Sequence, residues 1–153
     1  MKPSDLSIFY ALNDTEAAIL TIYGEARGEP FEGKQAVGVV IENRAVKHNQ
    51  TVKAVCYAPS QFSCYLSADP NYPKLLSIAK NFQFALNGLG GQPMLQECSR
   101  AWTESCPDVD KLLDGATFYE VQGTVNAWFD NMKASGKLVK TASIGHHDFY
   151  KEA

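Results

Sequence analysis

The sequence lacks any apolar run near the roughly 18 residues that a membrane-spanning helix requires. It also lacks an excess of basic charge, because 14 Lys and Arg side chains stand against 17 Asp and Glu, a net charge of −3. Nucleic-acid-binding proteins usually gather basic residues on one face, so this balance argues against nucleic acid as a partner. No repeat, low-complexity tract or linker divides the 153 residues, of which 45% are hydrophobic. We therefore expect one monomeric domain over 1–153 with a substantial core.

Patterns typical of metal sites are also scarce. The sequence has three His, and its four Cys form two pairs eight residues apart, wider than the spacing of a zinc knuckle. We expect no metal and no organic cofactor. Disulfides Cys56–Cys64 and Cys98–Cys106 would close the smallest loops and are the pairing that we favour. Spacing alone allows three connectivities, and zinc binding and buried free thiols stay open.

Hydrophobic periodicity predicts a mainly helical chain. The expected helices cover 16–26, 31–47, 72–87 and 125–135, with a short one near 95–104. Residues 116–121 are rich in aromatic and β-branched side chains and predict a strand, and 139–150 also has strand character. Residues 48–71 read as a structured loop, and 1–13 as a leading segment of undefined structure. The expected fold class is α+β, mainly helical with a small two-stranded β element.

Glu25 stands at the end of the first expected helix, between two glycines and just before a proline. The helix should partly bury its carboxyl group, and burial raises the pKa of a carboxyl. A glutamic acid that stays protonated near neutral pH is suited to cleaving a glycosidic bond, because the leaving oxygen must receive a proton. The residues alone nevertheless favour a solvated charge cluster of Glu25, Arg27 and Glu29 at a helix end over a catalytic role.

The block around Glu25 resembles a known family. Residues 23–44 read YGEARGEPFEGKQAVGVVIENR, which is similar to the signature of the SleB-type cell wall hydrolases, the spore cortex-lytic enzyme family. Three further blocks follow in that family's order, VCYAPSQFSCY at 55–65, GATFY at 115–119 and IGHHDFY at 144–150. The resemblance covers about 15–150. One departure is His146, where the family's closing motif usually has Asn.

The resemblance implies a lysozyme-like fold that cleaves the MurNAc–GlcNAc β-1,4 bonds of peptidoglycan glycan strands. Relatives of this kind act as lytic transglycosylases, and the glutamate that matches Glu25 is their catalytic acid. The resemblance therefore favours the catalytic interpretation of Glu25 over the solvated charge cluster.

The carboxylates that follow Glu25 bear on the type of reaction. Hydrolytic glycosidases normally use two carboxyl groups. The next ones here are Glu29, which lies across the helix break, Glu32, and Glu42, which lies deep in the second helix. A lytic transglycosylase needs no second carboxylate, because one glutamate protonates the glycosidic oxygen and then takes a proton from the C6 hydroxyl of MurNAc. We therefore favour transglycosylation with a 1,6-anhydro product, and keep a hydrolytic muramidase as the alternative.

Several side chains are candidates for substrate binding, and each also has a purely structural interpretation. Gln61 is expected to bind a sugar N-acetyl group, Phe62 to pack on a sugar ring, and Tyr119 to orient Glu25 or the glycan. Arg27 is expected to hold Glu29 or a lactyl carboxylate. The full set of candidates is Arg27, Glu29, Gln61, Phe62, Tyr119 and His147.

Three other functions remain as alternatives. A zinc amidase would need converging ligands, but His146 and His147 are adjacent and point to opposite faces of a strand. A cysteine peptidase would pair Cys56 or Cys64 with His147. A glycan-binding module without catalysis would not need to keep Glu25, so the intact motif argues against it.

The first residues lack the apolar stretch of a secretory signal. We therefore expect synthesis in the cytoplasm and action at the cell wall or periplasm after release through a holin-type pore, as for a phage endolysin. Any disulfides would then form only in the periplasm.

Overall fold

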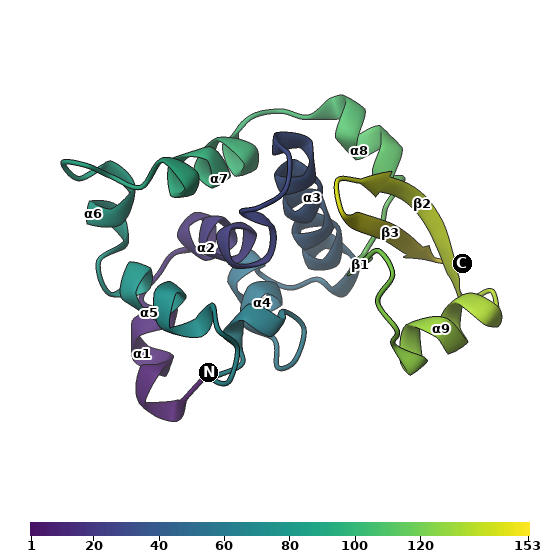
Figure 1. Ribbon diagram of the computed structural model, residues 1–153, viewed down its shortest axis with the longest axis horizontal. Coiled ribbons are helices and arrows are strands. Elements are labelled where there is room, and N and C mark those ends of the chain that lie inside the picture. The colour runs from purple at the N-terminus through teal and green to yellow at the C-terminus, as the bar shows by residue number, and fades with distance from the viewer.

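The computed structural model describes all 153 residues and shows helices over most of the chain, with one small sheet near the C-terminus (Figure 1). The α-helices are α1 (Leu6–Tyr10), α2 (Asp14–Ala26), α3 (Phe31–His48), α4 (Val52–Tyr57), α5 (Tyr72–Lys80), α6 (Phe82–Asn87), α7 (Pro93–Thr103), α8 (Pro107–Leu113) and α9 (Ala127–Ala134). The strands are β1 (Phe118–Val121), β2 (Leu138–Ile144) and β3 (His147–Glu152), and two short 3₁₀ turns cover Pro3–Asp5 and Ser63–Tyr65. The expected α+β, mainly helical fold class is confirmed. No helix has both the length and the apolar character needed to cross a membrane.

Helix α2 is the central element of the helical part. Asn13 caps its start, since Asn13 Oδ1 accepts a hydrogen bond from Glu16 N (2.8 Å) and Glu16 Oε1 accepts one from Asn13 N (3.1 Å). Every residue from Ala17 to Gly24 is buried. A helix that is buried all round needs neighbours on every side, and α2 packs against α3, α4, α5 and α7. Helix α2 is therefore held on all sides and fixes the position of Glu25 in its last turn.

Helix α3 lies between the helical part and the sheet (Figure 1). Val37 and Ile41 belong to the larger hydrophobic core with α2, whereas Val39 and Val40 belong to a smaller core with Phe149 of β3. The helix ends at Asn49, which adopts a left-handed conformation (φ 51°). Because α3 contributes to both cores, it fixes the sheet relative to α2.

The sheet has three strands rather than the expected two. Its order is β1–β3–β2, and both pairs are antiparallel. The segment expected to have strand character, 139–150, is a hairpin that turns at Gly145, whose φ is +58°. The turn was missed because the residues on both sides of Gly145 favour strands.

Two further expectations needed correction, and one helix had no counterpart among the expected ones. The expected helix 72–87 is two helices, α5 and α6, because Asn81 takes a non-helical conformation (φ −150°, ψ 60°). The loop expected over 48–71 contains α4, which Thr51 caps by accepting a hydrogen bond from Ala54 N (3.1 Å). Helix α8 was not expected at all. These are short helices, for which hydrophobic periodicity is a weak signal.

Candidate active site

Glu25 lies in the last turn of α2 and is half-buried. The neighbouring Gly24 allows the segment of Ser63 and Cys64 to pack directly on the helix. A Cβ atom at position 24 would lie 2.8 Å from both Cβ and Sγ of Cys64, closer than atoms can pack. The absence of a side chain at Gly24 thus brings residues 63–64 close to Glu25.

The surroundings of Glu25 raise the pKa of its carboxyl group. Burial is the largest cause, and the negative charge of Asp69 adds to it. The backbone N–H and thiol of Cys64 and the backbone N–H of Ser63 lie close enough to favour the carboxylate form, and they partly oppose the rise. Glu25 therefore stays protonated to higher pH than an ordinary glutamate, while donors stand ready to stabilise its ionised form.

Asp69 is the carboxylate that sequence reasoning missed. It lies 44 positions after Glu25, in the loop before α5, and is half-buried. Its Oδ1 accepts a hydrogen bond from Asn71 N (2.8 Å), which holds the side chain in place. None of the three carboxylates considered from the sequence lies beside Glu25 in this way, because Glu32 is exposed on α3, Glu29 is held by His146, and Glu42 lines a hollow between α3, α7 and α8.

Tyr119 and Arg44 lie near enough to Glu25 for its charge to act on both of them. The pKa of the Tyr119 hydroxyl is raised well above its usual value by burial and then by the Glu25 charge. Arg44 is only 9% exposed, and burial lowers the pKa of its guanidinium group against the opposing effects of Tyr119 and Glu25. The expectation that Tyr119 lies near Glu25 agrees with this arrangement, although its role stays a prediction. Arg44 was not singled out from the sequence.

Glu29 joins the α2–α3 turn to the β2–β3 hairpin. Its Oε1 accepts a hydrogen bond from the backbone N–H of His146 (2.8 Å), and its Oε2 lies 2.6 Å from His146 Nδ1. His147 Nδ1 lies 3.2 Å from Glu29 Oε1, and the His147 ring packs on Tyr119 with centroids 4.8 Å apart. Lys34 donates a hydrogen bond to the Glu29 carbonyl. Glu29 thus lies against His147, and His147 packs on the Tyr119 ring, so both residues help to hold Tyr119 in place.

Two expected contacts differ in the structure, that of Arg27 with Glu29 and that of Phe62 with a sugar ring, while binding of a lactyl carboxylate by Arg27 stays a prediction. Arg27 does not pair with Glu29; its Nη2 donates to Asn71 Oδ1 (2.5 Å), and its guanidinium group lies over the Tyr23 ring. Phe62 is 3% exposed and packs beneath Arg44, so it offers no ring face to a sugar. Gln61 is exposed and lines a hollow beside Arg44, where contact with substrate stays a prediction.

The two expected disulfides are absent, since all four cysteines are free. The neighbours of the thiols differ. Cys56 contacts Thr21 and Cys64 contacts Glu25, while Cys98 lies near Lys34 and Cys106 near Glu42. Burial raises the pKa of Cys56 and of Cys98 to about 12. Protonated, buried thiols are poor nucleophiles, which argues against a cysteine peptidase.

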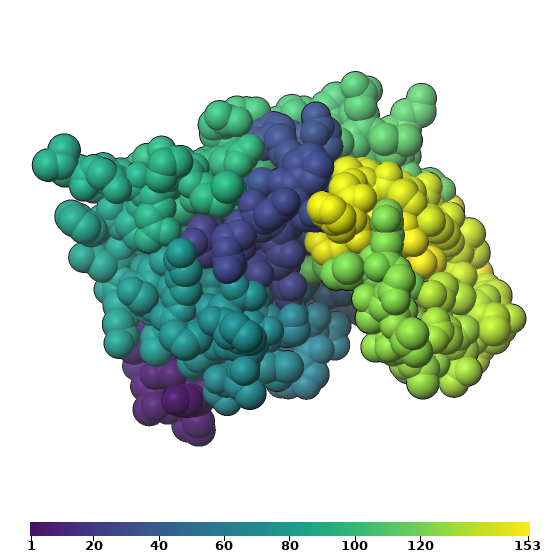
Figure 2. All heavy atoms as spheres, in the orientation of Figure 1, coloured from purple at the N-terminus to yellow at the C-terminus, as the bar shows by residue number.

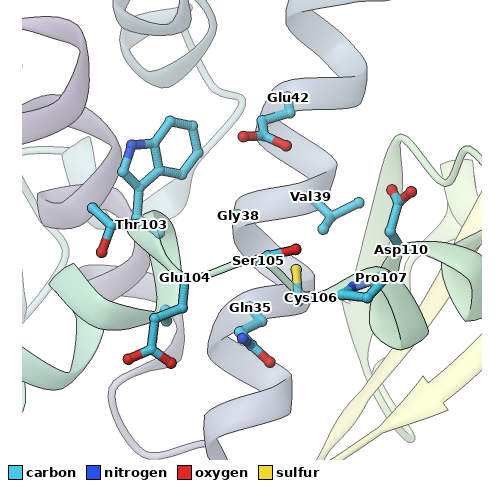
Figure 3. Close-up of a pocket in the computed structure, with 12 residues that line it drawn as sticks. Gln35, Gly38, Val39, Glu42, Thr103, Glu104, Ser105, Cys106, Pro107 and Asp110 are labelled. Carbon is cyan, nitrogen blue, oxygen red and sulfur yellow. The ribbon is translucent and has the colours of Figure 1, made fainter.

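A hollow of about 480 Å³ between α3, α7 and α8 contains neither Glu25 nor any of the expected substrate-binding residues. Gln35, Gly38 and Glu42 line it from one side of α3 (Figure 3). Arg44 follows Gln35 by nine residues, about two and a half helical turns, and therefore points to the opposite side. Helix α3 thus separates this hollow from Glu25.

The comparisons with known proteins agree with this geometry. A family model described as Cell Wall Hydrolase matches residues 28–150, a range that begins just after Glu25. A spore cortex-lytic enzyme of Oceanobacillus iheyensis is 43% identical over 56 residues, which are 35% of this chain and 20% of that protein. One from Halalkalibacterium halodurans is 27% identical over 119 residues, 72% of this chain and 36% of that protein. The matches thus span about a third or less of these relatives.

Two solved structures share the fold. The catalytic domain of the Bacillus cereus SleB protein aligns over 90% of this chain and 89% of its own, with a TM-score of 0.59 and 22% identity. The catalytic domain of the germination-specific lytic transglycosylase SleB from Bacillus anthracis aligns over 90% and 93%, with a TM-score of 0.56 and 22% identity. These likenesses establish the fold, and the matching family model covers most of the chain. The chain belongs to the cell wall hydrolase family.

Proposed function

We propose that this domain is a lytic transglycosylase that cleaves the β-1,4 bond between MurNAc and GlcNAc in peptidoglycan. The observation that carries the proposal is Glu25, a half-buried residue whose raised pKa keeps its carboxyl group protonated to higher pH than an ordinary glutamate. Membership of the cell wall hydrolase family supports peptidoglycan as the substrate.

In this reaction Glu25 acts twice. As an acid it protonates the glycosidic oxygen while the bond from C1 of MurNAc to that oxygen breaks. As a carboxylate it then takes the proton of the C6 hydroxyl as the C6 oxygen bonds to C1, which closes a 1,6-anhydro ring and restores the acid. The donors at Ser63 and Cys64 stabilise the carboxylate between the two steps, and the nearby positive charge of Arg44 does the same.

Hydrolysis of the same bond is the second candidate, because Asp69 acts electrostatically on Glu25. A carboxylate close enough to raise the pKa of the acid is a candidate base or nucleophile for a hydrolytic glycosidase. Transglycosylation and hydrolysis differ in product, since hydrolysis leaves a reducing MurNAc end and transglycosylation a 1,6-anhydro end.

Mass spectrometry of purified peptidoglycan digested by the wild type and by Asp69→Asn tests the proposal. We expect 1,6-anhydro-MurNAc ends from both proteins, with Asp108→Asn, an exposed aspartate on α8, as the matched control. Reducing MurNAc ends that disappear in Asp69→Asn would establish hydrolysis instead. Stem peptides released from intact glycan would contradict both and indicate an amidase.

We further propose that the domain acts as a monomer in host-cell lysis, as a phage endolysin that reaches the wall from the cytoplasm through a holin-type pore. The wall substrate expected for the family supports this role, since lysis from within requires cutting peptidoglycan. Expression in a bacterial host is expected to cause lysis only when a separate pore-forming protein is co-expressed. Lysis without the pore former would contradict this route.

A further inference from the structure

Arg44 is a buried cation that forms no direct ion pair, although the charge of Glu25 acts on it from beyond 4.0 Å. Its Nε donates a hydrogen bond to the Thr117 carbonyl (2.5 Å), and its guanidinium group lies between the rings of Phe62 (5.0 Å) and Phe118 (5.5 Å). No carboxylate lies within 4.0 Å of the Arg44 guanidinium group. Elsewhere in the molecule, nine pairs of acidic and basic groups lie within that distance. Burying a charge is costly unless it is paired. The position therefore favours an anion brought by another molecule.

Two hydrogen-bonding atoms point to where that anion would bind. Arg44 Nη1 and Thr117 Oγ1 are both buried, and neither has a hydrogen-bond partner. Arg44 is 9% exposed and Thr117 is 4% exposed. Both residues line one hollow of about 430 Å³ between α3, α4 and the start of β1. In native proteins almost all buried polar atoms have partners, so two orphans in one hollow indicate a missing ligand.

The lining of this hollow suits a negative group. It holds no Asp or Glu, and it contains hydrogen-bond donors besides Arg44 and Thr117. The lining residues are Arg44, His48, Gln50, Val55, Ala58, Gln61, Thr117 and Phe118. A guanidinium group and a hydroxyl side by side match the two oxygens of a carboxylate.

Two segments of the chain that line the hollow continue directly into the candidate active site. Gln61 is followed directly by Phe62 and then by Ser63 and Cys64, the donors to Glu25. Phe118 is followed by Tyr119. The surface is indented between the part of the chain that contains α4 and the part that runs from β1 to α9 (Figure 2). A sugar bound at Glu25 could therefore place a substituent in the hollow.

We propose that the Arg44–Thr117 hollow is a specificity site that binds a carboxylate carried by MurNAc next to the cleaved bond. This inference rests on the proposed function, since it takes peptidoglycan as the substrate. Two sources share this chemistry, the lactyl group of a peptide-free MurNAc and the stem peptide of a substituted one. GlcNAc has neither, so the site would distinguish the two sugars of the strand and set which bond lies at Glu25.

Calorimetric titration of the Glu25→Gln protein, which should bind without turnover, tests the inference. Three probes are compared: a GlcNAc–MurNAc tetrasaccharide with free lactyl carboxylates, the same tetrasaccharide with lactyl carboxamides, and one with stem peptides. We expect one of the two acidic probes to bind about 10- to 100-fold more tightly than the carboxamide, as for a hydrogen-bonded charged group. The acidic probe that binds tightly identifies the source of the carboxylate.

Variants in the same background assign the preference to the hollow. Arg44→Gln should bring the ratio of acid to amide affinity to about one, and Thr117→Val, which keeps the side-chain shape, should reduce it several-fold. Arg100→Gln removes an equal charge from an exposed site on α7 and should leave the ratio unchanged. If Arg44→Gln does not fold, Thr117→Val still tests whether the hollow is the source of the preference for the acid.

Equal affinity for acid and amide, or a preference that survives both substitutions, would overturn the inference. Failure of the proposed function would look different, because the wild type would then release no glycosidic product whatever the binding preference. Binding and product analysis therefore test the two proposals separately.

Discussion

Replacing Glu25 with Gln is expected to slow glycan cleavage by about 10²- to 10⁴-fold, the range for loss of a general acid–base group. We expect the upper part of that range, because the same carboxyl group serves both the protonation and the ring-closing step. Gln keeps the shape of the side chain but has no proton to donate at neutral pH. The rate of muropeptide release from purified peptidoglycan measures the effect.

Glu32→Gln is the matched control, because Glu32 is exposed on α3 and is expected to leave the rate unchanged. Thermal unfolding of both variants should match that of the wild type, which separates chemistry from folding. A Glu25→Gln protein that is folded and cleaves at the wild-type rate would exclude Glu25 as the acid.

The same group gives the rate its dependence on pH. Burial and Asp69 raise the pKa of Glu25, so the protonated form, and with it the rate, should persist to higher pH than for an ordinary glutamate and fall above that pKa. Asp69→Asn removes one of the two causes of the raised Glu25 pKa. In this variant the rate should therefore begin to fall at a lower pH than in the wild type.

The second large effect is on stability. Glu29→Ala is expected to lower the free energy of unfolding by about 2 kcal/mol, because it leaves the His146 N–H without its acceptor and removes the carboxylate that the His146 ring contacts. Chemical denaturation of the wild type and the variant measures the loss. Glu32→Ala, at an exposed position of the next helix, should change stability by no more than about 0.5 kcal/mol. Equal losses in the two variants would refute the role of Glu29.

The effect of Glu29 should depend on pH with a definite sign. Burial raises the pKa of Glu29, but the stronger combined effect of the His146 ring, the His146 backbone N–H and the His147 charge lowers it below 4.5. A carboxyl group with a lowered pKa stabilises the folded state above its unfolded pKa and loses that contribution as pH falls. The difference between wild type and Glu29→Ala should therefore narrow as the pH drops below 4.5.

Local features of the site could be predicted from the sequence. Glu25 was identified because its helix, the following break and the family signature all lie within one continuous segment, residues 16–44. The surroundings of Glu25 could not be predicted in the same way, since Asp69, Arg44 and Tyr119 reach it only through tertiary packing. Arg44 lies inside the recognised signature, but nothing local shows that its charge is buried without a direct ion pair.

The fold shows the same division. The expected helices in the regions of α2 and α3 are confirmed because each has a long hydrophobic pattern and a clear end. The hairpin at Gly145 was missed because a single glycine between two strand-forming runs is a weak signal. The preference for disulfides came from loop length, and in the structure Cys56 and Cys64 instead pack against Thr21 and Glu25.

The bond from His146 to Glu29 spans 117 residues, which bears on the order in which the protein is synthesised and folds. A ribosome therefore produces Glu25 and α2 more than 100 residues before the hairpin that meets Glu29 and contacts Tyr119 through His147. Contacts between residues so far apart in the chain are slow to form in folding. The proposed acid is thus synthesised well before the surroundings that complete its site, and the site is finished only when the β2–β3 hairpin docks.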